Sequence, residues 1–272
     1  MSLTRRVLLA GAGLLSSIEV AAEPDTLIYP RHEALQDAQI GYILALMRLA
    51  LTRSKRRYKL SQTASVMVQS RALIELSKPD APVDVFWTMT NRQREQTLLP
   101  IRIPLERGLI GWRLALVRRA DRERLREVRR LSDLAAFKAG QMHDWPDTAI
   151  LRANGLTVET STHYQSLFQM LALGRIDYFP RSLIEITTEL EAYRHLDLAI
   201  EPNLLLYYPT ALYLFVNPRR PLLAADLTEG LEAIQADGSF ERLFRQQFGP
   251  LLASHEMAKR QVLRLHNPEL PP

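Results

Sequence analysis

Cysteine is absent from this sequence of 272 residues. Its absence excludes disulfides, thiolate metal sites, a cysteine nucleophile and a lipid-modified N-terminal cysteine. Because 47% of the residues are hydrophobic, the chain is long enough to bury one large core or two modest ones. We therefore expect the fold to be held together by its cores alone.

Long hydrophobic runs are also absent. No segment has about 18 uninterrupted apolar residues, the length that a membrane-spanning helix needs. A shorter apolar run at residues 7–18 follows Arg5 and Arg6 and precedes the small residues 20–22, an order typical of a secretory signal. Paired arginines are compatible with both the twin-arginine (Tat) and the general secretory (Sec) routes. We predict a signal peptide over residues 1–22 and a soluble periplasmic protein that is not a lipoprotein; a frayed N-terminal helix is the alternative.

Signatures of catalysis, metal binding and nucleic-acid binding are missing too. There is no G-x-S-x-G nucleophile elbow, and the six histidines show no H-x-x-x-H spacing. Seven arginines crowd residues 118–130, but acidic residues separate them and no aromatic residue is present to stack on a base. We predict no enzyme, no catalytic residue, no metal site, no cofactor and no nucleic-acid partner.

Lysine is scarce. Only five of the 35 basic residues are lysine, and the formal net charge is +5. A codon composition that favours arginine would explain this preference without any function. Attraction of anions would explain it as well, because guanidinium groups form bidentate hydrogen bonds. The sequence leaves both interpretations open.

The hydrophobic pattern of the N-terminal part predicts alternating strands and helices. Helical spacing over residues 40–51 ends at a basic cluster, and a second helix is expected over residues 69–76. The strand-like segments around these helices are residues 27–30, where Pro30 should stop the strand, 58–63 and 83–88. This order predicts a parallel sheet with right-handed crossovers.

The same alternation restarts in the second half of the chain. The expected strands are residues 109–117, 136–141, 156–160, 176–179, 204–208 and 211–216, and the expected helices are residues 148–153, 164–173, 222–236 and 240–248. The tail, residues 250–272, is expected to be an extended strap over the surface. The pattern predicts an α/β fold with a second lobe.

The order of these motifs resembles that of the bacterial extracellular solute-binding proteins of family 3, which have the type II periplasmic binding fold. TMTNRQR at residues 88–94 is similar to the family's threonine-rich loop, which bears an arginine. LFQMLALGRID at residues 167–177 is similar to its second-lobe helix, glycine turn and strand, and residues 236–249 are similar to its C-terminal helix pair. The resemblance covers residues 26–249.

The resemblance implies two α/β lobes, each a mainly parallel sheet flanked by helices, joined by two hinge strands. Lobe I would comprise residues 23–107 and 209–272, and lobe II residues 109–205, with a ligand enclosed between them. Closure would be a hinge motion driven by the ligand's preference for the closed state.

In lobe I, the resemblance implies that Arg94 pairs with a ligand carboxylate, since a planar guanidinium suits that geometry. Arg92 competes for this role, and either arginine is also compatible with a solvated charge at a helix start. Thr88 and Thr90 would supply donors, although β-propensity alone also explains them. Three further candidates leave strands at the same edge, of which the last is equally compatible with the core: Tyr29, Arg31 and Trp87.

In lobe II, residues 140–148 lie where the family has a loop that opens a helix. Pro146 and the nearby capping residues favour a helix start, and free N–H groups at a helix N-terminus bind anions. The residues of this lobe that we expect to face the cleft are His143, Asp144, Trp145, Thr148, Thr162 and Tyr164. An elaborate helix cap without ligand contacts is the alternative.

Arg181 is a departure from the amino-acid-binding members of the family, which hold the ligand's ammonium group with an acidic residue near this point. Together with Arg94 and Arg31, Arg181 would favour an anionic ligand. Asp144 or Glu185 would restore an acidic contact.

Ligand binding without chemistry is the function that these features favour. The resemblance implies an exported monomer that binds a small anionic or zwitterionic organic molecule for ABC-type uptake or for sensing. An inner-membrane permease or a sensor would then be its partner. The alternative is an interaction protein, a sensor's partner with a vestigial pocket, and a periplasmic enzyme is less favoured.

Overall fold

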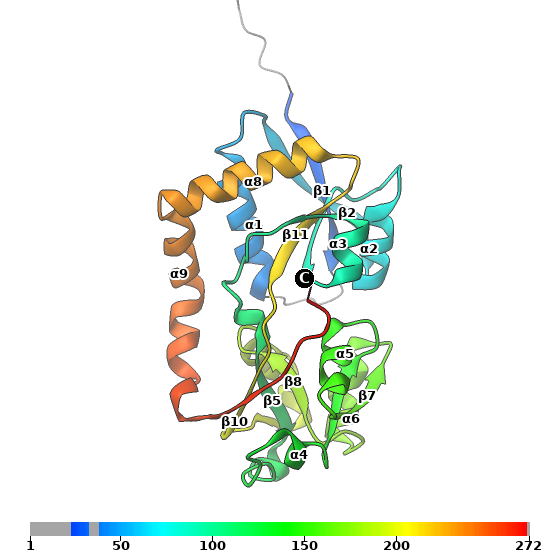
Figure 1. The fold of residues 1–272 in the computed structure, drawn as a ribbon, viewed down its shortest axis with the longest axis vertical. Coiled ribbons are helices and arrows are strands. Elements are labelled where there is room, and N and C mark those ends of the chain that lie inside the picture. Colours follow the sequence, from blue (N-terminus) through cyan, green and yellow to red (C-terminus); the bar gives the residue numbers. More distant parts are fainter. Residues whose placement is uncertain (1–22, 33–37, 271–272) are drawn as a thin grey trace, which may run out of the picture.

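The computed structural model describes residues 23–32 and 38–270 and shows two lobes, one above the other in Figure 1. The predicted signal peptide lies outside the described residues. Across the described ranges, no helix combines the length and the apolar character needed to cross a membrane.

Lobe I is the upper lobe in Figure 1. Its strands are β1 (Asp25–His32), β2 (Tyr58–Met67), β3 (Val85–Met89), β4 (Leu99–Ile101) and β11 (Leu212–Val216). Its helices are α1 (Ala38–Leu51), α2 (Gln69–Ser77), α3 (Arg92–Thr97) and α8 (Pro221–Ala236). Strands β1 and β2 pair in parallel as predicted, whereas β11 pairs antiparallel with both β3 and β4.

Strand β1 continues through Pro30, where the sequence predicts that it ends. Its ladder with β2 changes register between Tyr29 and Arg31, so that Pro30 falls in an irregular step. Proline cannot donate a ladder hydrogen bond, and a bulge is a place where a strand accommodates it. The backbone N–H of Arg31 then donates to the hydroxyl of Thr63, 2.9 Å away.

Lobe II is the lower lobe in Figure 1. Its strands are β5 (Trp112–Arg118), β6 (Lys138–Met142), β7 (Thr157–Ser161), β8 (Phe179–Ser182), β9 (Leu198–Ile200) and β10 (Leu204–Tyr207). Its helices are α4 (Leu131–Leu134), α5 (Pro146–Ala153), α6 (Tyr164–Ala172) and α7 (Ile186–Ala192). Strands β6 and β7 pair in parallel, but β5 runs antiparallel to β8, β9 and β10. The α/β class is confirmed, and both lobes combine parallel and antiparallel pairing: lobe I has a parallel pair beside an antiparallel three-stranded sheet, and β5 of lobe II runs antiparallel to its neighbours.

The C-terminal segment differs from the expectation. Helix α9 (Ser239–Ser254) runs past Pro250 and descends from lobe I to lobe II (Figure 1). Strand β12 (Gln261–Arg264) then pairs in parallel with β10, as the edge of the lobe II sheet. The assignment of all of residues 209–272 to lobe I is therefore revised. The unpaired N–H and C=O groups along the edge of β10 find partners in β12, which a surface strap would not supply.

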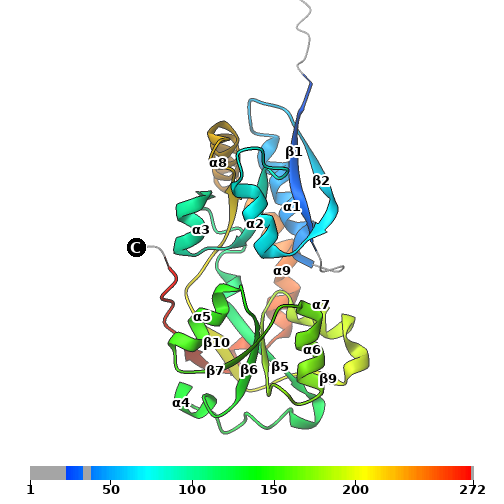
Figure 2. The same cartoon turned by 90° about the vertical axis from the view of Figure 1, so that its right-hand side faces the viewer.

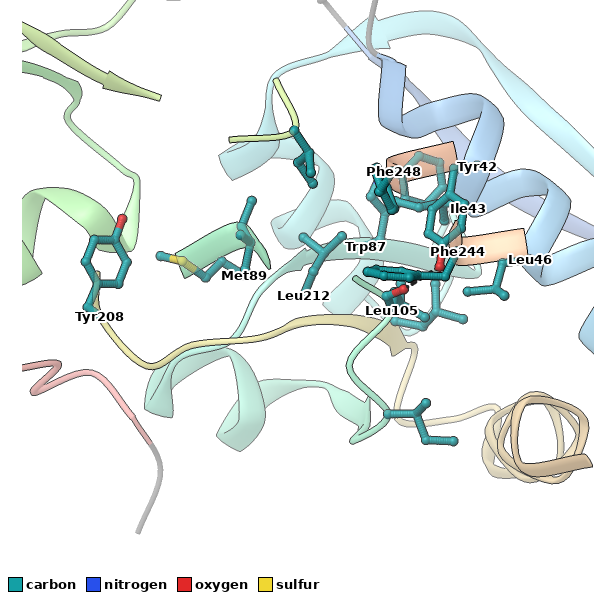
Figure 3. Close-up of a cluster of buried hydrophobic side chains, with 14 of the residues drawn as sticks. Tyr42, Ile43, Leu46, Trp87, Met89, Leu105, Tyr208, Leu212, Phe244 and Phe248 are labelled. Carbon is teal, nitrogen blue, oxygen red and sulfur yellow. Dashed lines mark hydrogen bonds between the residues drawn. The ribbon is translucent and has the colours of Figure 1, made fainter. Parts of the chain in front are cut away.

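A continuous hydrophobic cluster connects helices α1 and α9 with the central strands of lobe I. In Figure 3, Tyr42 lies against Phe248, with ring centroids 4.7 Å apart. The cluster continues through Trp87 to Met89 and reaches Tyr208. Tyr208 begins the second crossing between the lobes, residues 208–211, which connect β10 of lobe II to β11 of lobe I. The core of lobe I therefore extends to the place where the lobes meet.

Gly230 sets the distance between α8 and α1. A Cβ atom at this position would lie 2.3 Å from the backbone oxygen of Ala50, and neither backbone can give way cheaply. Gly230→Ala should therefore destabilise the fold by about 2 kcal/mol, the usual cost of overpacking. Gly41→Ala is the matched control, because a Cβ on Gly41 of α1 meets nothing within 4 Å and alanine favours a helix. Urea unfolding measures both, and equal midpoints for the two variants would contradict the prediction.

Candidate ligand-binding cleft

A cavity of about 190 Å³ lies between the lobes. A cavity of this size holds several water molecules, so a small organic molecule fits in it. Lobe I lines it with Gln39, Met67, Val68, Gln69, Trp87, Thr88, Met89 and Leu212. Lobe II lines it with Ile110, Arg113, Met142, Asp144, Trp145, Pro146, Asp147, Tyr164, Arg181, Glu185, Thr188 and Glu189.

Arg94 is a buried cation on the lobe I side. The side chain of Asn91 accepts from the backbone N–H of Arg94 and caps α3, which turns the arginine back toward the end of β3. Its Nη1 donates to Thr88 Oγ1 at 2.9 Å and to the backbone oxygen of Met89 at 2.6 Å, two residues that line the cavity. The Arg94 side chain forms no ion pair with a carboxylate among the described residues, although only 7% of the residue is exposed. Burial lowers the pKa of Arg94 to about 10.

Asp144 is the complementary feature on the lobe II side. It follows β6 in the loop that opens α5, and it lines the cavity. Its Oδ1 atom is buried and has no hydrogen-bond partner within the described ranges. A buried carboxylate oxygen without a donor is costly, so this atom favours a bound group with N–H or O–H donors. The charge of Asp144 also favours the charged form of Arg94.

Arg181 lines the cavity but is fully engaged by lobe II. Glu189 accepts from its Nε at 2.7 Å and from its Nη2 at 2.6 Å, and a Glu185 oxygen lies 2.9 Å from the same Nη2. The ring centroid of Trp145 lies 4.7 Å from its guanidinium carbon. Burial alone would lower the pKa of Arg181, but the charges of Glu185 and Glu189 outweigh it and hold the pKa well above its usual value. We therefore no longer expect Arg181 to bind an anionic group.

Arg113 forms a second buried network that the sequence analysis missed. Its Nη2 lies 2.8 Å from Asp147 Oδ1, its Nε donates to the hydroxyl of Tyr208 at 2.7 Å, and that hydroxyl donates to Asp147. The three residues come from β5, from α5 and from the second crossing. Burial is the main reason that the pKa of Tyr208 is well above its usual value. The network joins the cleft to the hinge, and a single arginine inside the apolar run of β5 was its only sequence signal.

The predicted site residues divide into two groups. Those that line the cavity are Trp87, Thr88, Asp144, Trp145, Tyr164 and Arg181. Those that do not line it are Tyr29, Arg31, Thr90, Arg94, His143, Thr148 and Thr162. Arg94 nevertheless contacts two lining residues, as described above.

The other residues of the second group have local roles. Tyr29 packs behind Trp87, with ring centroids 5.9 Å apart, and Thr90 donates to Glu95. Thr148 donates to the backbone oxygen of Met142 at the start of α5. The exposed residues are Arg31, which donates to the backbone of Ala64, His143, whose ring nitrogen faces Ser161, and Thr162, which contacts His163.

No group of three or more histidine, aspartate or glutamate residues that could hold a metal ion occurs within residues 23–32 and 38–270.

The architecture defines a class of fold: two α/β lobes with a cavity between them form the type II periplasmic binding fold. The chain is similar in structure to an ancestral arginine-binding protein bound to arginine, with a TM-score of 0.61 and 15% identity over 82% of this chain and 98% of the other. It is also similar to a probable amino-acid ABC transporter extracellular-binding protein from Bacillus subtilis, with a TM-score of 0.61 and 16% identity over 84% of this chain and 99% of the other. A histidine kinase sensor domain with similarity to periplasmic binding proteins is similar as well, with a TM-score of 0.59 and 16% identity over 84% of this chain and 97% of the other. No family model and no curated protein sequence matches the chain.

Arg181 supports two buried carboxylates, and its removal provides a test. Arg181→Met should destabilise the protein by about 3–5 kcal/mol at neutral pH, since Glu185 and Glu189 lose their counter-charge. Burial already raises the pKa of Glu185 in the folded state and the charge of Arg181 opposes that rise, so removal of Arg181 raises the pKa of Glu185 further above its unfolded value of about 4.3. The defect should therefore be largest near neutral pH and shrink as the pH falls toward that value.

Urea unfolding at about pH 5 and about pH 7.5 measures this difference. Arg194→Met is the control, because Arg194 forms an exposed pair with Glu191 in the same lobe. A defect that is small, or that does not depend on pH, would show that the carboxylates do not rely on Arg181.

Proposed function

We propose that this protein is an exported solute-binding protein that encloses a small zwitterionic organic molecule between its lobes. Arg94 holds the anionic end of the ligand and Asp144 accepts from its cationic end. The observation that carries the proposal is that two charged groups beside the cavity are left without an opposite partner among the described residues. On the lobe I side Arg94 has no carboxylate partner, and on the lobe II side Asp144 Oδ1 has no donor.

A zwitterion suits the cleft better than a simple anion. Both arginines that line the cavity, Arg113 and Arg181, are already paired with carboxylates, and Arg94 lies behind two lining residues. The cleft also contains Glu185 and Asp144, which would repel a ligand that carries only negative charge. The walls between the polar ends are apolar and aromatic, from Met67 and Trp87 to Met142 and Trp145, and accept an uncharged body between the charged ends.

Contacts across the cleft support a closing motion. Gln39 of lobe I donates to Glu185 of lobe II at 3.1 Å, and Arg113 Nη2 lies 3.9 Å from the sulfur of Met89. A ligand that contacts both walls stabilises the closed lobes over the open ones by the difference in its binding free energy. A monomer in the periplasm that delivers its ligand to an inner-membrane permease or a sensor would use this motion. The names of the neighbouring structures, an ABC transporter binding protein and a sensor domain, are consistent with either role.

Removal of the cleft charges tests the proposal. Arg94→Met should weaken binding on the order of 100-fold, because hydrogen bonds to a charged group contribute about 1.5–3 kcal/mol each. Asp144→Asn, which keeps the shape and removes the charge, should weaken binding about tenfold or more. Arg102→Met is the control, because Arg102 pairs with Glu95 at the surface of the same lobe.

Native mass spectrometry of gently purified protein identifies a co-purified molecule, and calorimetry with that molecule gives the affinities. Equal affinities for the wild type and Arg94→Met would contradict the assignment of Arg94. A cleft that never retains a molecule, together with unchanged melting across a panel of small metabolites, would favour an interaction protein with a vestigial pocket.

A further inference from the structure

The last described residues, 265–270, connect the two lobes; we call them the C-terminal strap. After β12 the chain leaves lobe II and ends beside α3 of lobe I (Figures 1 and 2). The strap begins firmly on lobe II, where the N–H of Leu265 donates to the oxygen of Tyr207 at 2.8 Å. Asn154, the residue that caps the C-terminal end of α5, then exchanges two hydrogen bonds with the backbone of His266, at 2.7 and 2.9 Å.

The middle of the strap is attached to the second crossing. The side chain of Asn267 is buried and donates to the backbone oxygen of Pro209 at 2.8 Å. Its Oδ1 accepts from the backbone N–H of Glu269 at 2.9 Å, which fixes the turn toward lobe I.

The end of the strap is held by Arg92, the first residue of α3. The backbone N–H of Arg92 donates to the oxygen of Glu269 at 3.1 Å, and its Nε donates to the oxygen of Leu270 at 2.9 Å. Arg92, the alternative to Arg94 for pairing with a ligand carboxylate, is thus exposed and hydrogen-bonded to the C-terminal strap.

We propose that the C-terminal strap is a further connection between the lobes, besides the two crossings and helix α9, and that it stabilises their closed arrangement. The hydrogen bonds from Asn154 and from Arg92 can exist together only while α5 and α3 are close. In Figure 2, α3, α5 and the strap lie on one side of the molecule and α7 lies on the other. The strap and the contact of Gln39 with Glu185 therefore hold the lobes from two sides, and a hinge opening breaks the bonds of the strap to lobe I.

The strap also brings charge toward the cleft. Glu269 is one of three carboxylates, with Asp144 and Asp147, whose charges favour the charged form of Arg94 and oppose the lowering of its pKa by burial. Release of the strap therefore changes the electrostatics of the cleft as well as its width.

Arg92→Pro separates the strap from lobe I with little disturbance of α3. Proline has no N–H and no guanidinium, so that both bonds to the strap are lost, yet it is favoured at the first position of a helix. The preceding Asn91 has φ −153° and ψ 169°, an extended conformation that is compatible with a following proline. Arg92→Ala is the matched control, because it loses the side-chain bond and keeps the backbone one. Deletion of residues 266–272 removes the strap by an independent route.

Spin labels measure the separation of the lobes in the ligand-free protein. Because the chain has no cysteine, Arg71→Cys in α2 and Gln165→Cys in α6 introduce two unique exposed attachment points, one in each lobe. Double electron–electron resonance should give a short, narrow distribution of the distance between the two labels for the wild type and for Arg92→Ala. Arg92→Pro and the deletion should both give longer and broader distributions, with a closed-to-open ratio lower by roughly tenfold. Arg92→Pro in the deleted chain should add nothing further.

Unchanged distributions in both Arg92→Pro and the deletion variant would overturn the proposal, and so would equal broadening in Arg92→Ala and Arg92→Pro. If Arg92→Pro fails to fold, as judged by circular dichroism, the deletion decides the outcome. A weaker ligand affinity in the opened variants is a further expectation that depends on the proposed function. The lobe distances do not depend on it, so either proposal can fail without the other.

Discussion

The burial of charge between the two lobes is the constraint on which the rest of the structure depends. Arg113 and Arg181 both lie in lobe II with almost no solvent contact. A buried guanidinium is tolerated only when carboxylates and hydrogen-bond acceptors surround it. Asp147, Glu185 and Glu189 meet this need, and their positions determine how α5 and the segment leading into α7 approach the strands of lobe II.

The paired charges also determine what is left for a ligand. Once Arg181 is neutralised by Glu189 and Glu185, two groups remain unsatisfied: the Arg94 guanidinium on the lobe I side, which meets only neutral oxygens, and Asp144 Oδ1 on the lobe II side, which has no donor among the described residues. A molecule with charges of both signs would satisfy them together and hold the lobes closed. Arg113 and Tyr208 connect the lobe II wall of the cleft with the second crossing through buried contacts to each other and to Asp147.

Local pattern made much of the fold predictable. The helices over residues 40–51 and 69–76 and the strands over residues 58–63 and 83–88 appear close to their expected bounds, because apolar periodicity reports which face of an element is buried. The position of Arg94 near the end of β3 could also be predicted, because Asn91, which caps α3, is only three residues away in the sequence. Helix α7 and strand β12 were missed because both depend on partners elsewhere in the chain. Glu189 of α7 pairs with Arg181, and β12 pairs with the edge of β10.

The sequence alone determined the alternation of strands and helices, the two lobes, and the presence of arginines at the edge where the lobes meet. Tertiary structure decided which of those arginines is available. Arg181 and Arg94 look alike as residues, but one meets two carboxylates and the other meets only neutral oxygens. Arg92 is bound by a backbone oxygen 178 positions away. Whether a charge is open to a ligand depends on burial and on distant partners, and no local pattern in a chain records either of them.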